Sequence, residues 1–305
     1  MPHSLVPEAT NWTQHTLKAP IGCVGISLHC GRRVNLTFRP AAEDHGIVFR
    51  RTDLGVDIPA RFDRVVETRL ATVLGEPGGA RIGTVEHVLA ALAGCGIDNA
   101  LVEVDGPEPP ILDGSAAPFV FLLDCAGRVA QNALRSVIEV RQPVRVRDGD
   151  AFVELRPAAA GGTGLDMTLS IDFAAAAIGR QGVSLRLTPA SFRHELASAR
   201  TFALAEEIRG LRAAGLAQGG SLENAVVVDE ARVLNPAGLR TPDEFARHKL
   251  LDAVGDLALA GAPLWGCFIG HCSGHTLNNR LLQAFFGNPH AWRVTAGEPL
   301  SVAAA

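Results

Sequence analysis

The chain has 305 residues, of which 47% are hydrophobic and 20% are charged, with a formal net charge of −4. This composition is typical of a globular protein with room for two domains. Its basic residues are scattered along the chain, which excludes the concentrated positive charge of a nucleic-acid-binding protein, so no nucleic-acid partner is expected.

The sequence carries no sign of export or of membrane insertion. The first 13 residues contain no apolar run, and no later stretch reaches the roughly 18 consecutive apolar residues of a membrane-spanning helix. Six cysteines in a chain of this length do not indicate a disulfide framework. We therefore expect a cytoplasmic protein with free thiols, a flexible N-terminal segment at residues 1–13 and a C-terminal tail at residues 296–305.

Strand and helix signals alternate in the first half of the chain, residues 14–130, which we expect to form a first α+β domain. Apolar and polar residues alternate most clearly over residues 33–39, as in a half-buried strand. Thr84 is expected to cap the helix that carries Glu86 and His87, and the glycines after this helix are expected to end it. The predicted elements are strands at 33–39, 46–50 and 99–104 and helices at 85–93 and 115–123.

The second half, residues 131–295, repeats these signals as a second α+β domain and adds a βαβ-like insert at about 203–228. In the insert, Leu204, Ile208 and Leu211 predict an amphipathic helix, and a strand is predicted after it. This pattern fits an ordinary packed helix as well as an apolar wall for a ligand. The other predicted elements are strands at 137–140, 144–146, 152–155, 166–172, 183–187 and 263–270, and helices at 241–261 and from about 275.

The helix predicted over residues 241–261 carries the most informative side chains. Thr241 and Glu244 have the spacing of a capping box, which marks its start. His248 and Asp252 are four residues apart, so they project from one helix face on consecutive turns, and Asp256 continues the row. This spacing suits a metal site, although surface helices carry such pairs as well.

A further candidate ligand comes from the first half. Glu86 and His87 are adjacent in the first turn of their helix, so His87 can bind a metal while Glu86 reaches a water beside it. Together with His248 and Asp252, this gives two histidines, one carboxylate and an open position. That is the donor set of a catalytic zinc site.

A competing metal site must be weighed near the end of the second half. Four residues there resemble half of a structural zinc finger: Cys267, His271, Cys272 and His275. Because Cys267 falls inside a continuous apolar strand and no second pair of ligands has suitable spacing, we favour the first site.

The two halves follow the same order of elements. In each half, a helix with a candidate metal ligand ends at a glycine, a strand follows, and a second helix begins. His87 precedes Ser115 by 28 residues, and His248 precedes His275 by 27 residues. We infer an α+β fold of two similar domains, each an antiparallel sheet with a helix pair, packed as a β-α-α-β sandwich with the active site between them.

Six segments of the chain are similar, in this order, to the motifs of one enzyme family. They are Thr84–His87, Asp113–Phe119, Ser198–Phe202, Gly219–Asn224, Asp243–Asp252 and Ser273–Asn279. Over roughly residues 14–290, the chain thereby resembles the UDP-3-O-acyl-N-acetylglucosamine deacetylases, the zinc amidases that carry out the committed step of lipid A biosynthesis. The resemblance implies Zn²⁺ as cofactor and a lipid-linked UDP-sugar as substrate.

The resemblance also implies a role for each residue of a catalytic group: Glu86, His87, Thr201, His248, Lys249, Asp252, Asp256 and His275. Zinc is held by His87, His248 and Asp252. Glu86 acts as the general base, and His275, oriented by Asp256, acts as the general acid. Lys249 takes a supporting position, and Thr201 donates to the oxyanion.

The substrate contacts that the resemblance implies lie in the second half: Phe173, Phe202, Leu204, Ile208, Leu211, Gly220 and Ser221. Phe173 stacks on uracil, and the apolar side chains of the insert face the acyl chain. The chain departs from the family pattern where Ala174 follows Phe173 and where Cys272 replaces a lysine found in many members. Both departures concern the nucleotide and the diphosphate and leave the implied zinc ligands intact.

Two other functions stay open at this point. The departures near Phe173 and Cys272 are compatible with a related zinc amidase that acts on another N-acetylated sugar or metabolite. A non-catalytic carrier-binding protein would keep the fold, but it has no need of a base such as Glu86 beside a metal ligand. We expect a monomer that approaches the membrane at most transiently.

Overall fold

The computed structural model describes residues 12–159 and 162–296. Apart from Trp12 and Thr13, the N-terminal segment expected to be flexible lies outside the described residues, and so does the expected C-terminal tail apart from Ala296. Within the described part, the protein is α+β, with five sheets and six α-helices. None of these helices combines the length and the apolar character that crossing a membrane requires.

The main sheet of the first half has five strands in the order β2-β3-β9-β4-β5. They are β2 (Ile21–Ile26), β3 (Arg33–Pro40), β4 (Ile47–Arg51), β5 (Val56–Pro59) and β9 (Ala100–Val104). The predicted alternation is confirmed in β3, where Val34, Leu36 and Phe38 are buried between more exposed neighbours. The shorter elements after β5 are the 3-10 helix η1 (Phe62–Arg64) and a small sheet of β6 (Val65–Glu67), β7 (Val73–Gly75) and β8 (Arg81–Ile82).

A two-stranded sheet ends the first half. It pairs β1 (Thr13–Leu17) with β10 (Arg128–Leu134) in antiparallel fashion. The expected domain boundary at residue 130 therefore falls inside a strand that is bonded to the start of the chain. The connection between the two halves is the single residue Arg135, which lies between β10 and β11.

The second half has a seven-stranded sheet, in which β14 and β15 join the path β12-β13-β19-β11-β20 through β19. Its strands are β11 (Ser136–Val140), β12 (Val144–Asp148), β13 (Ala151–Arg156), β14 (Leu165–Asp172), β15 (Arg180–Leu187), β19 (Leu264–His271) and β20 (Trp292–Ala296). The expectation of purely antiparallel sheets is wrong. β4 runs parallel to β9, and β19 runs parallel to β11 and β14. A stretch containing a helix separates the strands of each parallel pair, and such a crossover returns the chain in the same direction.

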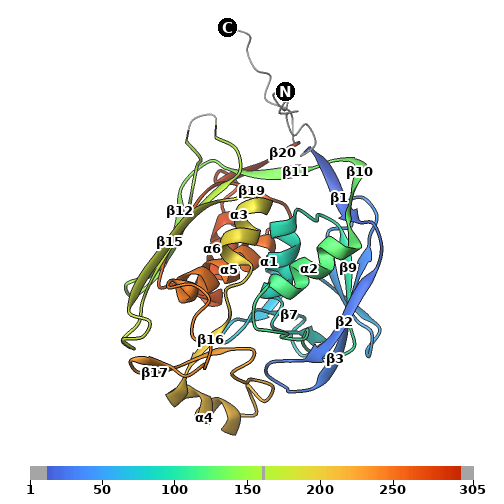
Figure 1. Ribbon diagram of the computed structural model, residues 1–305. Coiled ribbons are helices and arrows are strands. Elements are labelled where there is room, and N and C mark those ends of the chain that lie inside the picture. Colours follow the sequence, from blue (N-terminus) through green and yellow to red (C-terminus); the bar gives the residue numbers. More distant parts are fainter. Residues whose placement is uncertain (1–11, 160–161, 297–305) are drawn as a thin grey trace, which may run out of the picture.

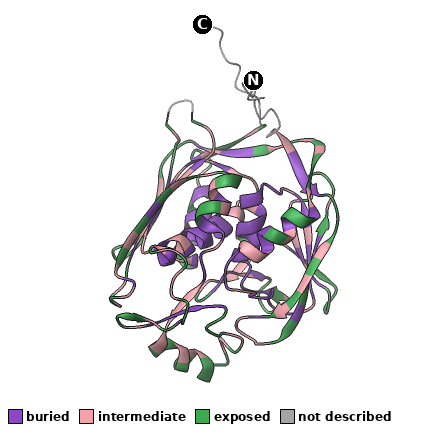
Figure 2. Ribbon diagram, viewed as in Figure 1, coloured by how far each residue is buried: buried purple, intermediate pink, exposed green. Residues whose placement is uncertain are grey.

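The long helices lie between the two large sheets (Figure 1). The helices outside the insert are α1 (Glu86–Cys95), α2 (Ala117–Ala126), α3 (Pro189–Ser191), the π-helix η2 (Phe192–Leu196), α5 (Glu244–Ala258) and α6 (His275–Phe286). α1 packs along α5, and Gly255 permits this approach, because a Cβ there would lie 2.1 Å from the carbonyl oxygen of Glu86. The buried residues form one core that includes both helices (Figure 2).

The order of elements confirms the internal repeat of helix, strand and helix. The first half contains α1, β9 and α2 in succession, and the second contains α5, β19 and α6. Each of α1 and α5 is therefore the first helix of this repeat in its half. These two helices also pack against each other.

Two predicted helix caps are wrong. Thr84 has a φ of 53° and a buried hydroxyl without a hydrogen-bond partner, and Val85 takes the N-cap position of α1. A left-handed residue does not have the extended backbone of a capping residue. Thr241 does not cap α5 either, because the N-cap position is taken by Asp243 and the backbone N–H of Glu244 donates to the carbonyl oxygen of Thr241 at 3.2 Å instead of to its hydroxyl. Glu244 directs its carboxylate to Arg200. At Glu244, a tertiary ion pair replaces the local cap.

The insert forms a βαβ unit at the lower end of the view in Figure 1. β16 (Phe202–Leu204) pairs in parallel with β17 (Val226–Asp229), α4 (Ala205–Ala213) connects them, and β18 (Arg232–Val233) adds a third strand. Leu204, Ile208 and Leu211 are half-buried, whereas the charged residues of α4 are exposed. The predicted amphipathic helix is confirmed.

Candidate active site

Four ionisable side chains form a row along α5. Glu244, His248, Asp252 and Asp256 are spaced four residues apart, so each lies about one turn beyond the previous one on the same helix face. All four are buried. Burying so many ionisable groups is costly unless each has a partner, so the partners of this row define the site.

The histidine of α1 completes a group that can hold a metal ion. Nε2 of His87 lies 3.5 Å from Oδ1 of Asp252, and Nε2 of His248 lies 3.4 Å from the same oxygen. In the described part of the chain, these three residues form a group whose ligand atoms all lie within 4.8 Å of one another. Oδ1 of Asp252 is buried and has no hydrogen-bond donor among the described residues, which fits an oxygen whose partner is a cation.

The protonation states in this group are those of metal ligands. Nδ1 of His248 lies 3.1 Å from the carbonyl oxygen of Ala199, which can only accept, so Nδ1 carries the hydrogen and Nε2 keeps its lone pair. Burial lowers the pKa of His248 to about 4, against the effect of Asp252. Burial by itself raises the pKa of Asp252, but His248 and Lys249 bring that pKa well below its usual value. A neutral imidazole and an ionised carboxylate are the forms that bind zinc.

Glu86 lies beside the metal group at the start of α1. Its Oε2 accepts a hydrogen bond from the backbone N–H of Thr72 at 3.1 Å, and its Oε1 lies 3.9 Å from Nε2 of His275. Burial raises the pKa of Glu86 despite the nearby histidines. A carboxylate with a raised pKa takes up a proton more readily, so Glu86 has the position and the basicity of a general base.

His275 faces Glu86 from the start of α6. Its Nδ1 donates to Oδ2 of Asp256 at 2.9 Å. Burial lowers the pKa of His275, but Asp256 and Glu86 outweigh this effect and raise the pKa to about 9. The imidazole is therefore charged at neutral pH and can donate a proton from Nε2.

Two further residues hold this acid in place, and the sequence analysis did not identify either of them. Asp256 also accepts from Oγ1 of Thr72 at 2.5 Å and from Nδ2 of Asn278 at 2.8 Å. Asn278 lies three residues after His275, so helical spacing contained a signal for it. Thr72 lies in the loop before β7, and only the tertiary fold brings this loop to α5.

A cavity of about 360 Å³ adjoins this row. Lys249 and His275 line it, together with Arg69 and Cys272. Nζ of Lys249 donates to Oδ2 of Asp252 at 3.1 Å, so the lysine holds the ligand through the oxygen that does not face the histidines. A substrate in this cavity contacts the acid directly, and the base Glu86 lies behind the acid, with Oε1 3.9 Å from Nε2 of His275.

The competing cysteine cluster does not form within residues 12–159 and 162–296. His275 is bound to Asp256, and Nδ1 of His271 lies 2.9 Å from Oγ of Ser170. Cys272 does contact Nε2 of His271 at 3.7 Å, but this pair gains no third ligand atom near enough to share an ion.

The residues implied for nucleotide and oxyanion binding lie near His248. The ring of Phe202 lies 6.2 Å from that of His248 and 5.6 Å from that of Phe173. The backbone N–H of Thr201 donates to the carbonyl oxygen of Gly114 at 2.8 Å, which ties this strand to the first half. The structure therefore places Phe202 beside the metal ligand His248 and Phe173 beside Phe202, while Thr201 directly precedes Phe202 in the chain.

The other implied substrate residues lie in the insert and in the loop before β17. The loop carries Gly220 and Ser221 and contacts the first half, where the backbone N–H of Gly219 donates to the carbonyl oxygen of Leu28 at 3.0 Å. A Cβ at Gly219 would lie 2.2 Å from the carbonyl oxygen of Ser27, so only glycine permits this contact. Leu204, Ile208 and Leu211 are half-buried in the βαβ unit, and Leu204 also packs against the core of the molecule.

Two histidine nitrogens and one carboxylate oxygen around a buried point, with a basic carboxylate and an acidic imidazole beside them, define a metal-dependent hydrolase. The family model for the UDP-3-O-acyl N-acetylglycosamine deacetylases, LpxC, matches residues 14–287. The chain belongs to this family, whose members are zinc-dependent cytoplasmic enzymes.

Individual relatives agree with the family model. The chain is 52% identical to the UDP-3-O-acyl-N-acetylglucosamine deacetylase of Phenylobacterium zucineum (strain HLK1), over 95% of this chain and 99% of the relative. It is 51% identical to the enzyme of the same name from Anaeromyxobacter dehalogenans (strain 2CP-C), over 93% of this chain and 91% of the relative. The corresponding enzyme of Acidithiobacillus ferrooxidans is 50% identical over 92% of this chain and 91% of the relative. The resemblance inferred from the sequence motifs is confirmed.

Proposed function

We propose that this protein hydrolyses the 2-acetamido group of UDP-3-O-acyl-N-acetylglucosamine and releases acetate and a free amine, in lipid A biosynthesis. Family membership supports the substrate. The observation that carries the reaction is the buried oxygen of Asp252, which faces Nε2 of both His87 and His248 and has no hydrogen-bond donor. We also propose that the protein acts as a monomer.

In this proposal, the two halves are similar domains, packed as a β-α-α-β sandwich with the active site between them. The origin of the residues supports this arrangement: Glu86 and His87 come from α1, whereas His248, Asp252 and His275 come from α5 and α6. Neither half by itself supplies all three metal ligands together with the base and the acid. The reaction therefore depends on the close contact of α1 with α5 that Gly255 permits.

His87, His248 and Asp252 are the residues that would hold the zinc ion. When bound, zinc supplies a Lewis acid that lowers the pKa of water to about 7 and withdraws charge from the amide oxygen. Neighbouring residues keep two of these ligands in the form that binds a metal. Ala199 keeps the proton of His248 on Nδ1, and Lys249 occupies the second oxygen of Asp252.

Glu86 and His275 move the protons of the reaction. Glu86 removes a proton from the attacking water while the water oxygen forms a bond to the amide carbon. His275 gives its Nε2 proton to the sugar nitrogen as the carbon–nitrogen bond breaks, so a neutral amine and acetic acid result, and the acid then loses its remaining proton to become acetate. Asp256 holds Nδ1 of His275 at 2.9 Å and keeps Nε2 directed at the reacting groups. The hydroxyl of Thr201 stabilises the oxyanion that forms in between.

The substrate is held at positions remote from the amide. Phe173 stacks on the uracil next to Phe202, and the diphosphate lies along the cavity lined by Cys272. The acyl chain follows the apolar side of the insert, formed by Leu204, Ile208 and Leu211, near the loop of Gly220 and Ser221. Each buried methylene contributes about 0.8 kcal/mol, and this remote binding energy can be used in the transition state.

Acetate release from the 3-O-acylated UDP-sugar and from its non-acylated form tests the function. The proposal predicts release from the acylated substrate and a large loss of kcat/KM without the acyl chain. Equal rates with both substrates would identify a related amidase for another N-acetylated sugar. Binding of the acylated sugar by the zinc-loaded protein without release of acetate would identify a non-catalytic carrier-binding protein. Light scattering of the purified protein tests the monomer.

A further inference from the structure

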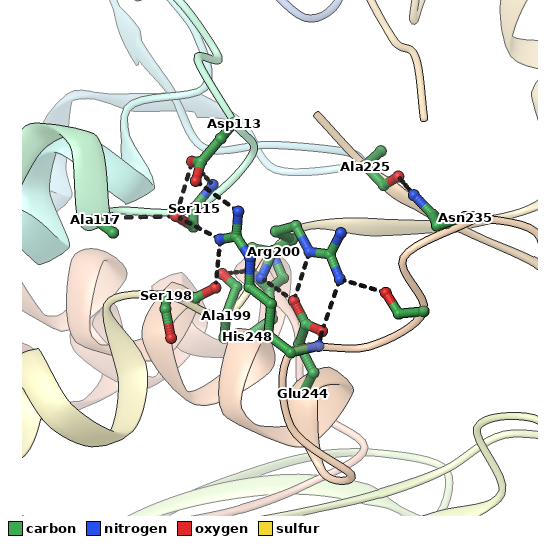
Figure 3. A network of polar contacts seen from close by, with 12 residues as sticks. Asp113, Ser115, Ala117, Ser198, Ala199, Arg200, Ala225, Asn235, Glu244 and His248 are labelled. Carbon is green, nitrogen blue, oxygen red and sulfur yellow. Dashed lines mark hydrogen bonds and ion pairs between the residues drawn. The ribbon is translucent and has the colours of Figure 1, made fainter. Parts of the chain in front are cut away.

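One peptide unit is held from both ends by residues of α5. The carbonyl oxygen of Ala199 accepts from Nδ1 of His248 at 3.1 Å. The N–H of the same peptide belongs to Arg200 and donates to Oε1 of Glu244 at 3.0 Å. Glu244 and His248 are four residues apart on one helix face, so consecutive turns of α5 hold the opposite ends of the Ala199–Arg200 peptide (Figure 3).

The carboxylate of Glu244 has no exposed surface and is surrounded by donors. Nε of Arg200 donates to Oε1 at 2.8 Å, and Nη2 of Arg200 donates to Oε2 at 3.0 Å. The backbone N–H of Arg240 donates to Oε2 at 2.6 Å. Burial raises the pKa of Glu244, but Arg200 and these N–H groups outweigh burial and leave the pKa below its usual value. The group is an ionised carboxylate with a single geometry, because four donors fix it.

Neighbouring contacts restrict the rest of the segment. The guanidinium of Arg240 donates to the carbonyl oxygen of Ser198 at 2.8 Å and to Oδ2 of Asp113 at 2.9 Å, which links the segment to the first half. The backbone N–H groups of Ala199 and Thr201 on either side donate to the carbonyl oxygens of Leu196 and Gly114. The contacts of the Ala199–Arg200 peptide itself are the one with Glu244 at its N–H and the one with His248 at its carbonyl oxygen.

We propose that Glu244 is a positioning residue for His248: by holding the N–H of the Ala199–Arg200 peptide, it directs the Ala199 carbonyl at Nδ1 and thereby fixes the tautomer and the orientation of the metal ligand. The inference rests on the ligand set of the proposed function. Partners of this kind, one step removed from a metal, change metal affinity by about 10- to 100-fold when they are lost. The four residues of the row on α5 then share three tasks: Glu244 holds the peptide, His248 and Asp252 bind the metal, and Asp256 holds the acid.

Two variants weaken the contact between the side chains of Glu244 and Arg200 but differ in their effect on the peptide. Glu244→Gln removes the charge and replaces one of the two acceptor oxygens by an NH2 group, so the four donors compete for a single oxygen and the hold on the peptide N–H weakens. Arg200→Lys removes the paired guanidinium contacts but keeps the backbone N–H of residue 200 bound to Glu244. The first variant should therefore affect the metal site, whereas the second should lower only the stability of the fold.

Metal affinity is measured on the metal-free full chain by competition of Zn²⁺ with a chelator, and the Co²⁺ form is examined by its visible absorption. We expect Glu244→Gln to raise the Kd for Zn²⁺ by about 10-fold or more and to change the Co²⁺ spectrum. Arg200→Lys should leave both unchanged. If Glu244→Gln folds poorly, the double variant Glu244→Met with Arg200→Met replaces the ion pair by apolar groups, which proteins often tolerate, and still removes the acceptor.

The inference would be overturned if both Glu244 variants kept the wild-type Kd for Zn²⁺ and the wild-type Co²⁺ spectrum. It would also be overturned if Arg200→Lys lost as much zinc affinity as Glu244→Gln. His248→Ala serves as the reference. If His248→Ala itself retained the metal with wild-type affinity, the ligand set would be wrong, and the proposed function would fail together with the inference. If His248→Ala lost zinc affinity and the Glu244 variants did not, the proposed function would stand and only the role of Glu244 would be rejected.

Discussion

Nδ1 of His275 donates to Oδ2 of Asp256 at 2.9 Å, although the two residues belong to different helices. The same carboxylate also accepts hydrogen bonds from Thr72 and Asn278. Asp256 therefore joins α5, α6 and the loop before β7 at one point. Because the donors come from α6 and from the loop before β7 while the acceptor belongs to α5, the orientation of His275 depends on tertiary structure and not on the local helix.

This contact should make stability depend on pH. Burial lowers the pKa of His275, but Asp256 and Glu86 raise it to about 9, whereas the imidazole of an unfolded chain titrates at about 6.5. A raised pKa in the folded state stabilises the protein fully below about pH 6.5, and this contribution is lost as pH rises through about 9. We expect the free energy of unfolding of the metal-free protein, measured by urea titration, to fall across this window.

The variant Asp256→Asn should make that fall shallower, because it removes the main charge that raises the pKa of His275. Asp63→Asn is the matched control, since Asp63 is exposed and pairs only with Arg61. It should keep the wild-type dependence on pH. A fall that Asp256→Asn leaves unchanged would show that another group titrates in this range.

The second prediction concerns the metal ligands. Purified protein should contain one zinc per chain, and His87→Ala or His248→Ala should release most of it, because each removes one of three donors. The double variant Cys267→Ser with Cys272→Ser should retain zinc, since neither cysteine belongs to the group around Asp252. Metal analysis after dialysis tests this prediction. If the cysteine variant lost zinc and the histidine variants kept it, the assignment of His87 and His248 as zinc ligands would be wrong.

The third prediction concerns the general base. Glu86→Ala should keep its zinc and lower kcat by at least about 100-fold, the usual effect of losing a positioned base. Substrate affinity should change little, because the implied substrate contacts lie elsewhere. Steady-state kinetics with metal analysis of the same sample test this prediction, and near-normal turnover of the zinc-loaded variant would falsify the mechanism.

The profile of activity against pH gives a separate readout of the acid. The wild-type profile should be bell-shaped, with one limb for Glu86 and one for His275. In His275→Ala, the limb at high pH should disappear or shift, while zinc stays bound. A profile that keeps both limbs would assign the general acid to another residue.

The fourth prediction concerns Cys272, which lines the cavity that we assign to the diphosphate. Cys272→Lys adds a cation there and should lower KM for the UDP-sugar at low ionic strength, with an advantage that shrinks as salt is added. The value of kcat should change little. Cys125→Lys adds the same charge at an exposed position of α2 and should leave KM unchanged.

Arg247 does not supply this cation, because it is bound to Asp243 at 2.7 Å and to Glu195. Arg247→Ala should therefore have no effect on KM. An unaltered KM and salt dependence in Cys272→Lys would mean that residue 272 does not face the diphosphate or that Lys249 and Arg69 already saturate the cavity.

The amino-acid sequence by itself determined the features that depend on local geometry. The spacing of His248, Asp252 and Asp256 sets them on one helix face wherever the helix lies, because 3.6 residues make one turn. The alternation in β3 likewise selects its buried face. The order of helix, strand and helix in each half was equally accessible, since it follows from hydrophobic periodicity and from glycines.

Only the tertiary structure decided which distant groups meet. Glu244 has the spacing of a capping residue, but the buried guanidinium of Arg200 offers its carboxylate a stronger, charge-assisted partner than a helix N-terminus does. Thr72 has no motif of its own and reaches Asp256 because the loop before β7 lies over α5. The parallel pairing of β19 with β14 also could not be predicted without knowing the path of the chain between these two strands. These contacts join residues that are far apart in the chain, and local propensity does not encode such distances.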